Sequence, residues 1–153
     1  MTRAAIGIGG SLGDRAGVVR AAIAALGELP QTRLLAASTL HETAPVGGVA
    51  RNRFINACAV LETELPPREL LAALQKLETQ FGREPAPRWA DRTLDLDLLL
   101  YDDLVLNDPL CTVPHPELHR RAFVLAPLAE IAPDWLHPVL RRTVADLARE
   151  VEF

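Results

Sequence analysis

Two aspartates, Asp95 and Asp97, stand at alternate positions in a run of leucines that follows Arg92 and Thr93. Alternate side chains of a β-strand share a face, about 6.6 Å apart at a rise of ~3.3 Å per residue. Two carboxylates this close repel each other and favour a cation between or beside them. Oxygen ligands suit Mg²⁺, which takes its other ligands from water and phosphate. The alternative is an exposed strand face with two solvated carboxylates.

An arginine-rich segment, residues 82–92, comes immediately before these aspartates. It contains Arg83, Arg88 and Arg92, together with Trp89 and two prolines. Forked guanidinium groups suit phosphate oxygens, and phosphoryl transfer needs cationic groups around the moving charge. The alternative is a solvated loop whose Trp89 packs onto the domain.

Three further features carry weaker signals. Gln75 and Glu78 are three residues apart on a predicted helix, so they share a face, which is also typical of an ordinary polar helix surface. His115 stands between two prolines after a predicted strand, where a structural role is the alternative. The glycines of segment 9–14 have neither the lysine nor the spacing of a Walker A loop.

The elements that must position these residues follow from hydrophobic periodicity and from turn residues. Strands are predicted over residues 3–9, 33–42, 53–63 and 93–100, with a small hairpin from 104–106 and 111–113. Helices are predicted over 15–29, from Pro66-Pro67 to Gly82, over 124–131, and from a Thr143 cap to about 150. This order predicts an α+β ferredoxin-like βαββαβ sandwich, with an antiparallel sheet, helices on one face and a C-terminal appendage.

Composition limits the function classes. The 153 residues fit a single domain (1–153), and the 49% of apolar residues supply a core. The net charge of −4, without a run of basic residues, argues against a nucleic-acid partner. The two cysteines lack the spacing of a zinc or redox motif, and Cys58 is predicted to be a core residue. No run reaches membrane-span length, so we predict a cytoplasmic monomer without membrane contact.

Taken together, these segments resemble the 6-hydroxymethyl-7,8-dihydropterin pyrophosphokinase family of folate biosynthesis. The resemblance covers nearly the whole chain. Its most specific parts are Arg88-Trp89 with Arg92-Thr93-Leu94-Asp95-Leu96-Asp97, then Val113-Pro114-His115-Pro116, and then Arg121-Ala122-Phe123-Val124-Leu125. It implies transfer of diphosphate from ATP to the hydroxymethyl group of the dihydropterin, with release of AMP and no covalent enzyme intermediate.

The resemblance also implies a role for each matching residue. Asp95 and Asp97 would hold two Mg²⁺ ions, and Arg83 and Arg92, with Arg121, would contact phosphates. The residues that would line the ATP side are Gln75, Glu78, Trp89, Arg92, Leu98, Thr112, His115 and Arg121. The residues that would recognise the pterin are Thr43, Ala44, Val46, Phe54, Asn56, Asp95 and Phe123, with the two phenylalanines on either side of its ring.

Several positions depart from the family pattern. The first turn has Gly9-Gly10-Ser11 in place of Gly-Ser-Asn, and Ala90-Asp91 replaces a Gly-Pro pair. Glu84 and Pro85 occupy the position of a second early arginine, and Leu110 replaces a basic residue. These departures keep two alternatives open: a diverged paralogue that binds pterin or nucleotide without efficient transfer, and a ligand-binding module without enzymatic activity.

Overall fold

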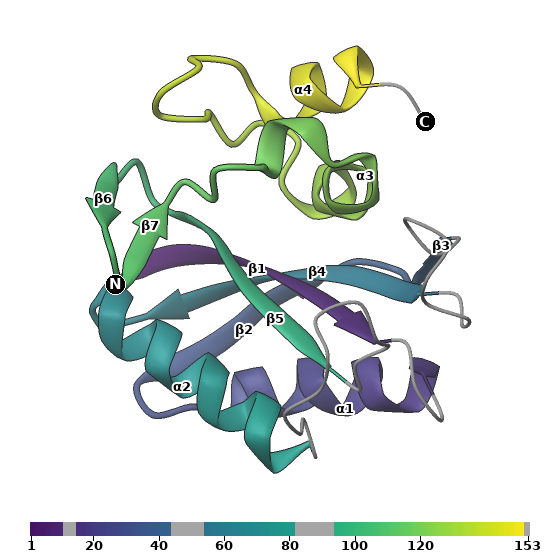
Figure 1. Ribbon diagram of the computed structural model, residues 1–153, viewed down its shortest axis with the longest axis vertical. Helices are drawn as coiled ribbons and strands as arrows, with labels where there is room; N and C mark the ends of the chain where they lie inside the picture. The colour runs from purple at the N-terminus through teal and green to yellow at the C-terminus, as the bar shows by residue number, and fades with distance from the viewer. Residues whose placement is uncertain (11–14, 44–53, 82–93, 152–153) are drawn as a thin grey trace.

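A computed structural model of the protein (Figure 1) describes residues 1–10, 15–43, 54–81 and 94–151. The strands in these segments are β1 (Thr2–Gly10), β2 (Thr32–Ala37), β3 (His41–Thr43), β4 (Phe54–Thr63), β5 (Asp95–Tyr101), β6 (Leu106–Asp108) and β7 (Cys111–Val113). The helices are α1 (Arg15–Gly27), α2 (Pro67–Gln80), α3 (Ala122–Ile131) and α4 (Val144–Glu150), and a 3-10 turn covers Leu118–Arg120.

The main sheet has the strand order β2-β4-β1-β5, and β3 pairs with β4 beyond the end of β2. Every pairing in it is antiparallel, with β1 in the centre between β4 and β5. The two βαβ units β1-α1-β2 and β4-α2-β5 therefore interleave their strands. This arrangement confirms the predicted ferredoxin-like sandwich.

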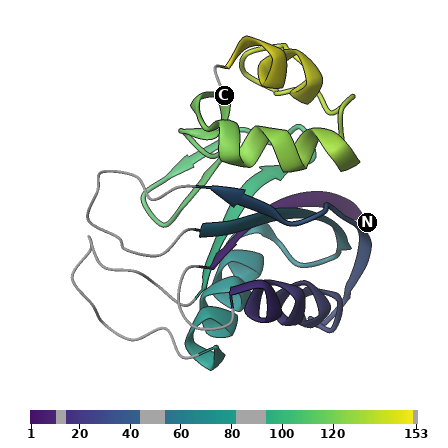
Figure 2. The same ribbon diagram turned by 90° about the vertical axis from the view of Figure 1, so that its right-hand side faces the viewer.

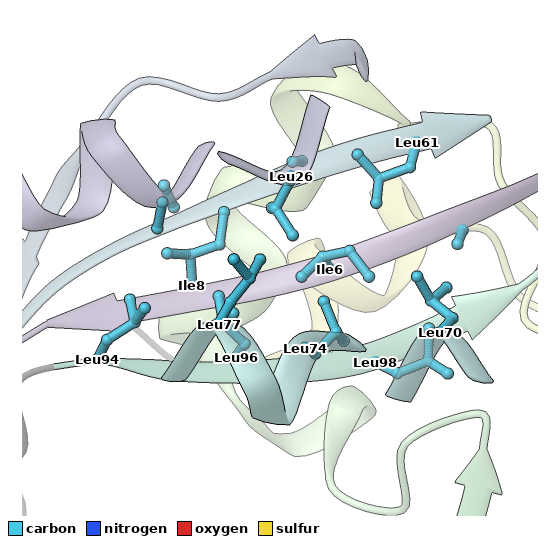
Figure 3. Packing of buried hydrophobic residues seen from close by; sticks show 14 of the residues in the cluster. Ile6, Ile8, Leu26, Leu61, Leu70, Leu74, Leu77, Leu94, Leu96 and Leu98 are labelled. Atoms are coloured by element: carbon cyan, nitrogen blue, oxygen red, sulfur yellow. The ribbon is translucent and has the colours of Figure 1, made fainter. Parts of the chain in front are cut away.

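One face of the sheet packs on α1 and α2 (Figure 1). Ala4, Ile6 and Ile8 alternate along β1 and are at most 2% exposed. The apolar stripe of α2 meets them with Leu70, Leu74 and Leu77, as Figure 3 shows. The α2 helix begins at Pro67, where the missing proline N–H costs no intrahelical bond. The predicted helix that opens at Pro66-Pro67 is thus confirmed.

The C-terminal segment covers the opposite face of the sheet, which the sequence did not predict. Helices α3 and α4 lie above the sheet in Figure 1, and the view in Figure 2 agrees. Val124, Leu125 and Leu128 of α3 pack on Val60 of β4 and Leu100 of β5. The appendage therefore supplies a third layer. Its last helix begins as predicted, because the Thr143 hydroxyl accepts a hydrogen bond from the Asp146 amide at 3.1 Å.

The expected single strand over 33–42 is divided into β2 and β3. Between them, the Ser38 amide donates to the Cys58 carbonyl, and the Cys58 amide donates to the Ser38 hydroxyl oxygen, both at 2.9 Å. The Ser38 hydroxyl thus replaces a backbone carbonyl as the acceptor for the Cys58 amide, and β3 is offset from β2. The first hairpin strand also lies two residues later than predicted, at Leu106–Asp108.

Within the described part of the chain, none of the helices has the length and apolar character that crossing a bilayer requires.

Candidate functional site

Asp95 and Asp97 alternate along β5 with Leu96 and Leu98, as the sequence predicts. Both leucines are at most 5% exposed in the core beneath α1 and α2, whereas the aspartates are half-buried. The carboxylates therefore project from the opposite face, on the side that α3 covers farther along the sheet. In the register of the sheet, Asp95 lies opposite Gly9 of β1 and Asp97 opposite Gly7.

These two glycines form a floor beside the aspartates that carries no side chains. On its other side, Gly9 pairs with Asn56 of β4 and Gly7 pairs with Cys58. A Cβ atom on Gly9 would lie 3.1 Å from Asn56 Oδ1, and one on Gly7 would lie 3.4 Å from a Leu99 methyl group. The Asn56 amide thus leans over the gap at Gly9. Gly7 is buried with the Leu99 side chain against it, whereas Gly9 is partly exposed beside Asn56.

The first residues of β4 complete the floor. Phe54, Asn56 and Cys58 alternate on the face that meets α3, and the Cys58 thiol donates to the Val124 carbonyl of that helix at 3.5 Å. Burial raises the pKa of the Cys58 thiol, so it stays protonated and acts as a structural donor. Its prediction as a core residue is confirmed. Phe54 and Asn56 are half-buried where the cover of α3 ends.

Glu78 holds the strand that carries the aspartates. Its carboxylate is 7% exposed, and Oε2 accepts the backbone N–H of Leu96 at 2.8 Å. Leu96 stands between Asp95 and Asp97, so this contact fixes the backbone from which both carboxylates project. Gln75, in contrast, is exposed. The two α2 residues do not form the shared polar surface that their spacing predicts.

His115 reaches the site through a fold of the chain after β7. Its backbone N–H donates to the Leu99 carbonyl at 2.9 Å, which ties it to β5 two residues beyond Asp97. The ring Nδ1 accepts the Glu117 amide at 3.1 Å, so the neutral ring carries its proton on Nε2. Burial lowers the pKa of His115, and the nearby Asp97 carboxylate opposes that shift. His115 is therefore a neutral donor near pH 7.

Arg121 and Phe123 lie at the beginning of α3. The Arg121 guanidinium lies 5.7 Å from the centre of the Phe123 ring, a cation–π geometry that fixes both side chains. The positive charge of Arg121 also lowers the pKa of His115, a smaller effect than burial and the Asp97 carboxylate. Asp97, His115 and Arg121 are thus brought close together from β5, from the segment after β7 and from α3.

The remaining predicted residues have different positions. Leu98 is 4% exposed within the core, so only its backbone is left to contact a ligand. Thr112 is exposed on β7, where its hydroxyl donates to the Asp108 carbonyl at 3.2 Å. The backbone of Thr43 pairs with Phe54. Five predicted site residues lie outside the described residues: Ala44, Val46, Arg83, Trp89 and Arg92.

The chain matches the 7,8-dihydro-6-hydroxymethylpterin-pyrophosphokinase family over residues 5–133, most of its length. It belongs to this family. It is 44% identical over 132 residues to the 2-amino-4-hydroxy-6-hydroxymethyldihydropteridine pyrophosphokinase of Pseudomonas aeruginosa, covering 86% of this chain and 82% of the relative. The enzyme of the same name from Haemophilus influenzae is 39% identical over 138 residues, which cover 90% of this chain and 86% of that one.

Solved structures of the family share the fold. The wild-type HPPK-DHPS of Plasmodium falciparum with pteroate superimposes with a TM-score of 0.77 over 97% of this chain, at 15% identity. The chain spans 42% of the length of that protein. The shared fold includes the C-terminal layer, because the match extends over almost all of this chain. The predicted family and fold are both confirmed.

Two features of the site were not predicted from the sequence. Gly7 and Gly9 alternate with Ile6 and Ile8, and this alternation was the available signal for a face without side chains. The second feature joins β3 to α3 through Thr39, His41 and Glu130. No local signal points to it, because Glu130 is 91 residues from Thr39.

Proposed function

We propose that this pyrophosphokinase transfers the β,γ-diphosphate of ATP to the hydroxymethyl oxygen of 6-hydroxymethyl-7,8-dihydropterin and releases AMP, a step of folate biosynthesis. Family membership gives the reaction class. The observation that carries the assignment to this site is the position of Asp95 and Asp97, side by side with a glycine floor on one face of the sheet. The carboxylates suit a phosphate-bound metal, and the floor suits a flat heterocycle.

Asp95 and Asp97 are the residues that would hold Mg²⁺, as two ions. Among the described residues, no group of three or more acidic, histidine or cysteine side chains forms a metal-binding cluster. A pair of carboxylates suits an ion that completes its octahedron with water and phosphate oxygens. When bound, the metal would neutralise the negative charge of the reacting phosphates. Glu78 supports this pair from behind through the Leu96 amide.

ATP would lie along β5 and the segment after β7. His115 would donate its Nε2–H to a phosphate or ribose oxygen, and Arg121 would supply a fixed positive charge. Gln75 and Thr112, both exposed, would contact the nucleoside side, and Leu98 would do so through its backbone. We assign Arg83, Arg92 and Trp89 to the same substrate, with the two arginines acting on the moving diphosphate.

The dihydropterin would lie on the glycine floor. Phe54 of β4 and Phe123 of α3 would face the two sides of its ring, and the Asn56 amide would bond to its polar edge. Thr43, Ala44 and Val46 would contribute through the chain that continues from β3. Asp95 would then be near the hydroxymethyl group, so that one carboxylate faces both substrates.

Catalysis would consist of positioning and charge stabilisation. The hydroxymethyl oxygen forms a bond to the β-phosphorus of ATP, and the bond from that phosphorus to the α,β-bridging oxygen breaks. The diphosphate moves directly between the substrates, AMP leaves, and the proton of the hydroxyl group passes to solvent. The residues of the chain bring the two reacting atoms into line and exclude water, because hydrolysis of ATP competes with the transfer.

The test is AMP formation from ATP and the dihydropterin with magnesium, by the wild type and by Asp97→Asn. We expect the variant to be slower by about a thousand-fold, since charge stabilisation of this kind is worth ~4 kcal/mol. The control is Asp103→Asn, which removes an exposed carboxylate just beyond the same strand and should leave the rate unchanged. EDTA should abolish AMP formation by the wild type.

Near-normal turnover of Asp97→Asn would overturn the metal assignment. A wild type that binds the dihydropterin but releases no AMP would favour the diverged paralogue that binds without transfer. We further propose that the enzyme acts as a cytoplasmic monomer on these two small substrates. Sedimentation of the purified chain at working concentration checks the monomer.

A further inference from the structure

One carboxylate on α3 holds the segment that leads into β3. Glu130 Oε1 accepts the Thr39 backbone N–H at 2.9 Å, and the Thr39 hydroxyl donates to the same carboxylate, 2.9 Å from each oxygen. Glu130 Oε2 also pairs with His41 Nε2. Three donor groups of one short segment thus converge on a single acidic side chain of another layer.

The contact between Glu130 and His41 is partly sheltered from solvent, and the Glu130 carboxylate in it is ionised at neutral pH. The His41 and Glu130 side chains are 29% and 33% exposed. The pKa of Glu130 is lowered, first by the bond from the Thr39 backbone and then by its bonds from the side chains of His41 and Thr39. The carboxylate therefore remains ionised at neutral pH. It accepts from Thr39 and His41 whether or not the His41 ring carries a second proton, since a neutral ring still has one N–H.

The segment that Glu130 holds needs such a support. β3 has three residues, and among the described strands it pairs only with β4. His41 lies opposite Asn56, and Thr43 lies opposite Phe54. Two of the three rungs between β3 and β4 therefore carry the proposed pterin residues of β4. A shift of β3 would displace the backbone opposite Asn56 and Phe54.

Glu130 lies near one end of α3, and the proposed pterin residue Phe123 lies near the other. The same helix is joined to β4 through the Cys58 thiol and the Val124 carbonyl. In Figure 1 the helix lies above the sheet with β3 to its right, and Figure 2 also places it above β3. Pro127 stands between Glu130 and Phe123 and removes the hydrogen bond to the Phe123 carbonyl. Glu130 is therefore linked to Phe123 through the packing of α3 on β4, where Val124, Leu125 and Leu128 are buried between them.

We propose that Glu130, acting through Thr39 and His41, is a positioning residue for the dihydropterin. It fixes β3 against α3. In this way it sets the spacing between the β4 residues of the pterin site, Phe54 and Asn56, and Phe123 of α3. This inference rests on the proposed function of that site.

The proposed role of Glu130 predicts that dihydropterin affinity depends on Glu130 more than ATP affinity does. The proposed ATP residues Gln75, Leu98 and Thr112 lie on α2, β5 and β7, whereas Thr39 and His41, the partners of Glu130, lie on none of these elements. Of the described ATP residues, only Arg121 adjoins the helix that carries Glu130. A loosened support weakens binding without removing any contact to the ligand.

The experiment titrates the dihydropterin and, separately, ATP with Mg²⁺ into the wild type, Glu130→Ala and Glu130→Gln. Thermal unfolding of each protein is measured in parallel. We expect Glu130→Ala to weaken dihydropterin binding about ten-fold and to change ATP binding by less than about two-fold. The dihydropterin affinity of Glu130→Gln should lie between those of the wild type and Glu130→Ala, because the amide oxygen still accepts from Thr39 but the charge is lost.

The matched control is Glu62→Ala. Glu62 is also a surface glutamate that joins two elements, since it pairs with Arg33 of β2 at 2.9 Å. It stands near the other end of β4, opposite Arg3 of β1. This variant should change neither affinity, so a loss of pterin binding in Glu130→Ala would not reflect a missing surface charge alone.

Two results would overturn the proposal: an unchanged dihydropterin affinity in Glu130→Ala, or an equal loss for both ligands together with a lower melting temperature. The second would give Glu130 a structural role only. Failure of the proposed pterin site gives a different result, since the wild type itself would then bind no dihydropterin. A wild type that binds the dihydropterin without releasing AMP would overturn the proposed transfer and leave the affinity test of Glu130 intact.

Discussion

The two faces of the central sheet differ in how they use the same strands. The face toward α1 and α2 is apolar along most of its length, with Ile6, Ile8 and Leu61 meeting Leu26 and Leu74 (Figure 3). The face toward α3 is apolar only along half of its length, where Ala5, Val60 and Leu100 meet the helix. Its other half carries glycines, aspartates and an asparagine.

This difference separates stability from function within one layer of backbone. A strand places alternate residues on opposite faces, so β5 delivers leucines to one side and aspartates to the other without a break in its hydrogen bonds. The α1/α2 face stabilises the sheet, and the polar half of the α3 face carries the residues that we propose bind the substrates. Changes on the two faces should therefore have separable effects.

The largest expected effect comes from Leu74→Ala, because Leu74 is 0% exposed at the centre of the α1/α2 face. Removing its side chain leaves a cavity and should lower the free energy of unfolding by about 2–5 kcal/mol. The folded fraction should keep its affinity for both substrates. Urea unfolding and substrate titration check this, with the 77% exposed Leu110→Ala as a control that costs little. If Leu74→Ala lost affinity for one substrate and kept it for the other, the roles of the two faces would not be separable.

A smaller and more specific effect is expected from Gly9→Ala. The new Cβ would lie 3.1 Å from Asn56 Oδ1, so the amide must shift by a few tenths of an ångström from its position over Gly9. We expect dihydropterin affinity to fall several-fold, about 1 kcal/mol, with ATP affinity retained. Gly27→Ala is the matched control: its Cβ would lie 3.3 Å from Leu34 Cβ, on the other face of the sheet. If Gly27→Ala lost dihydropterin binding while Gly9→Ala kept it, the assignment of the pterin to the α3 face would be wrong.

The smallest effect concerns His137, a buried imidazole in the α3/α4 layer. Its Nδ1 accepts the amides of Val139 and Leu140 at 3.2 and 3.1 Å, and burial followed by nearby His119 lowers its pKa. The unfolded chain then binds the proton more readily, so stability is complete above about pH 7 and falls as the pH drops through the ordinary histidine value of about 6.5.

His137→Asn keeps an acceptor for the two amides and removes the titration. The loss of stability between pH 7.5 and 5.5 should therefore become smaller in this variant, as urea unfolding at several pH values would measure. It should not vanish, because burial also lowers the pKa of His115. An unchanged pH dependence would show that the protonation of His137 is not linked to unfolding.

Local patterns predicted most of the elements of the fold. The leucine spacing of α2, the Pro67 start and the Thr143 cap all appear in the structure. The boundaries failed where a distant group decided them: β2 ends where Ser38 bonds to Cys58, twenty residues away. The 3-10 turn at Leu118–Arg120 was not predicted either.

For the candidate site, the sequence predicted which residue types meet but not always how. The alternation of Asp95 and Asp97 with leucines was correct. The contact of His115 with the same strand, through the Leu99 carbonyl, was not predicted. Glu78 is different. It was assigned to the ATP side, and the contact that the structure gives it is with the Leu96 amide, in the core of the domain.

The sequence by itself determined the order of most of the elements and the faces of β5 and α2, because periodicity of two or 3.6 residues is a local property of the chain. The family followed from the motifs that resemble it, in their order and spacing. Only the tertiary structure decided the rest. It placed α3 on the second face, tied His115 to Leu99, and joined Glu130 to Thr39 and His41. These contacts join segments far apart in the chain, and no local pattern records which distant donor a carboxylate will meet.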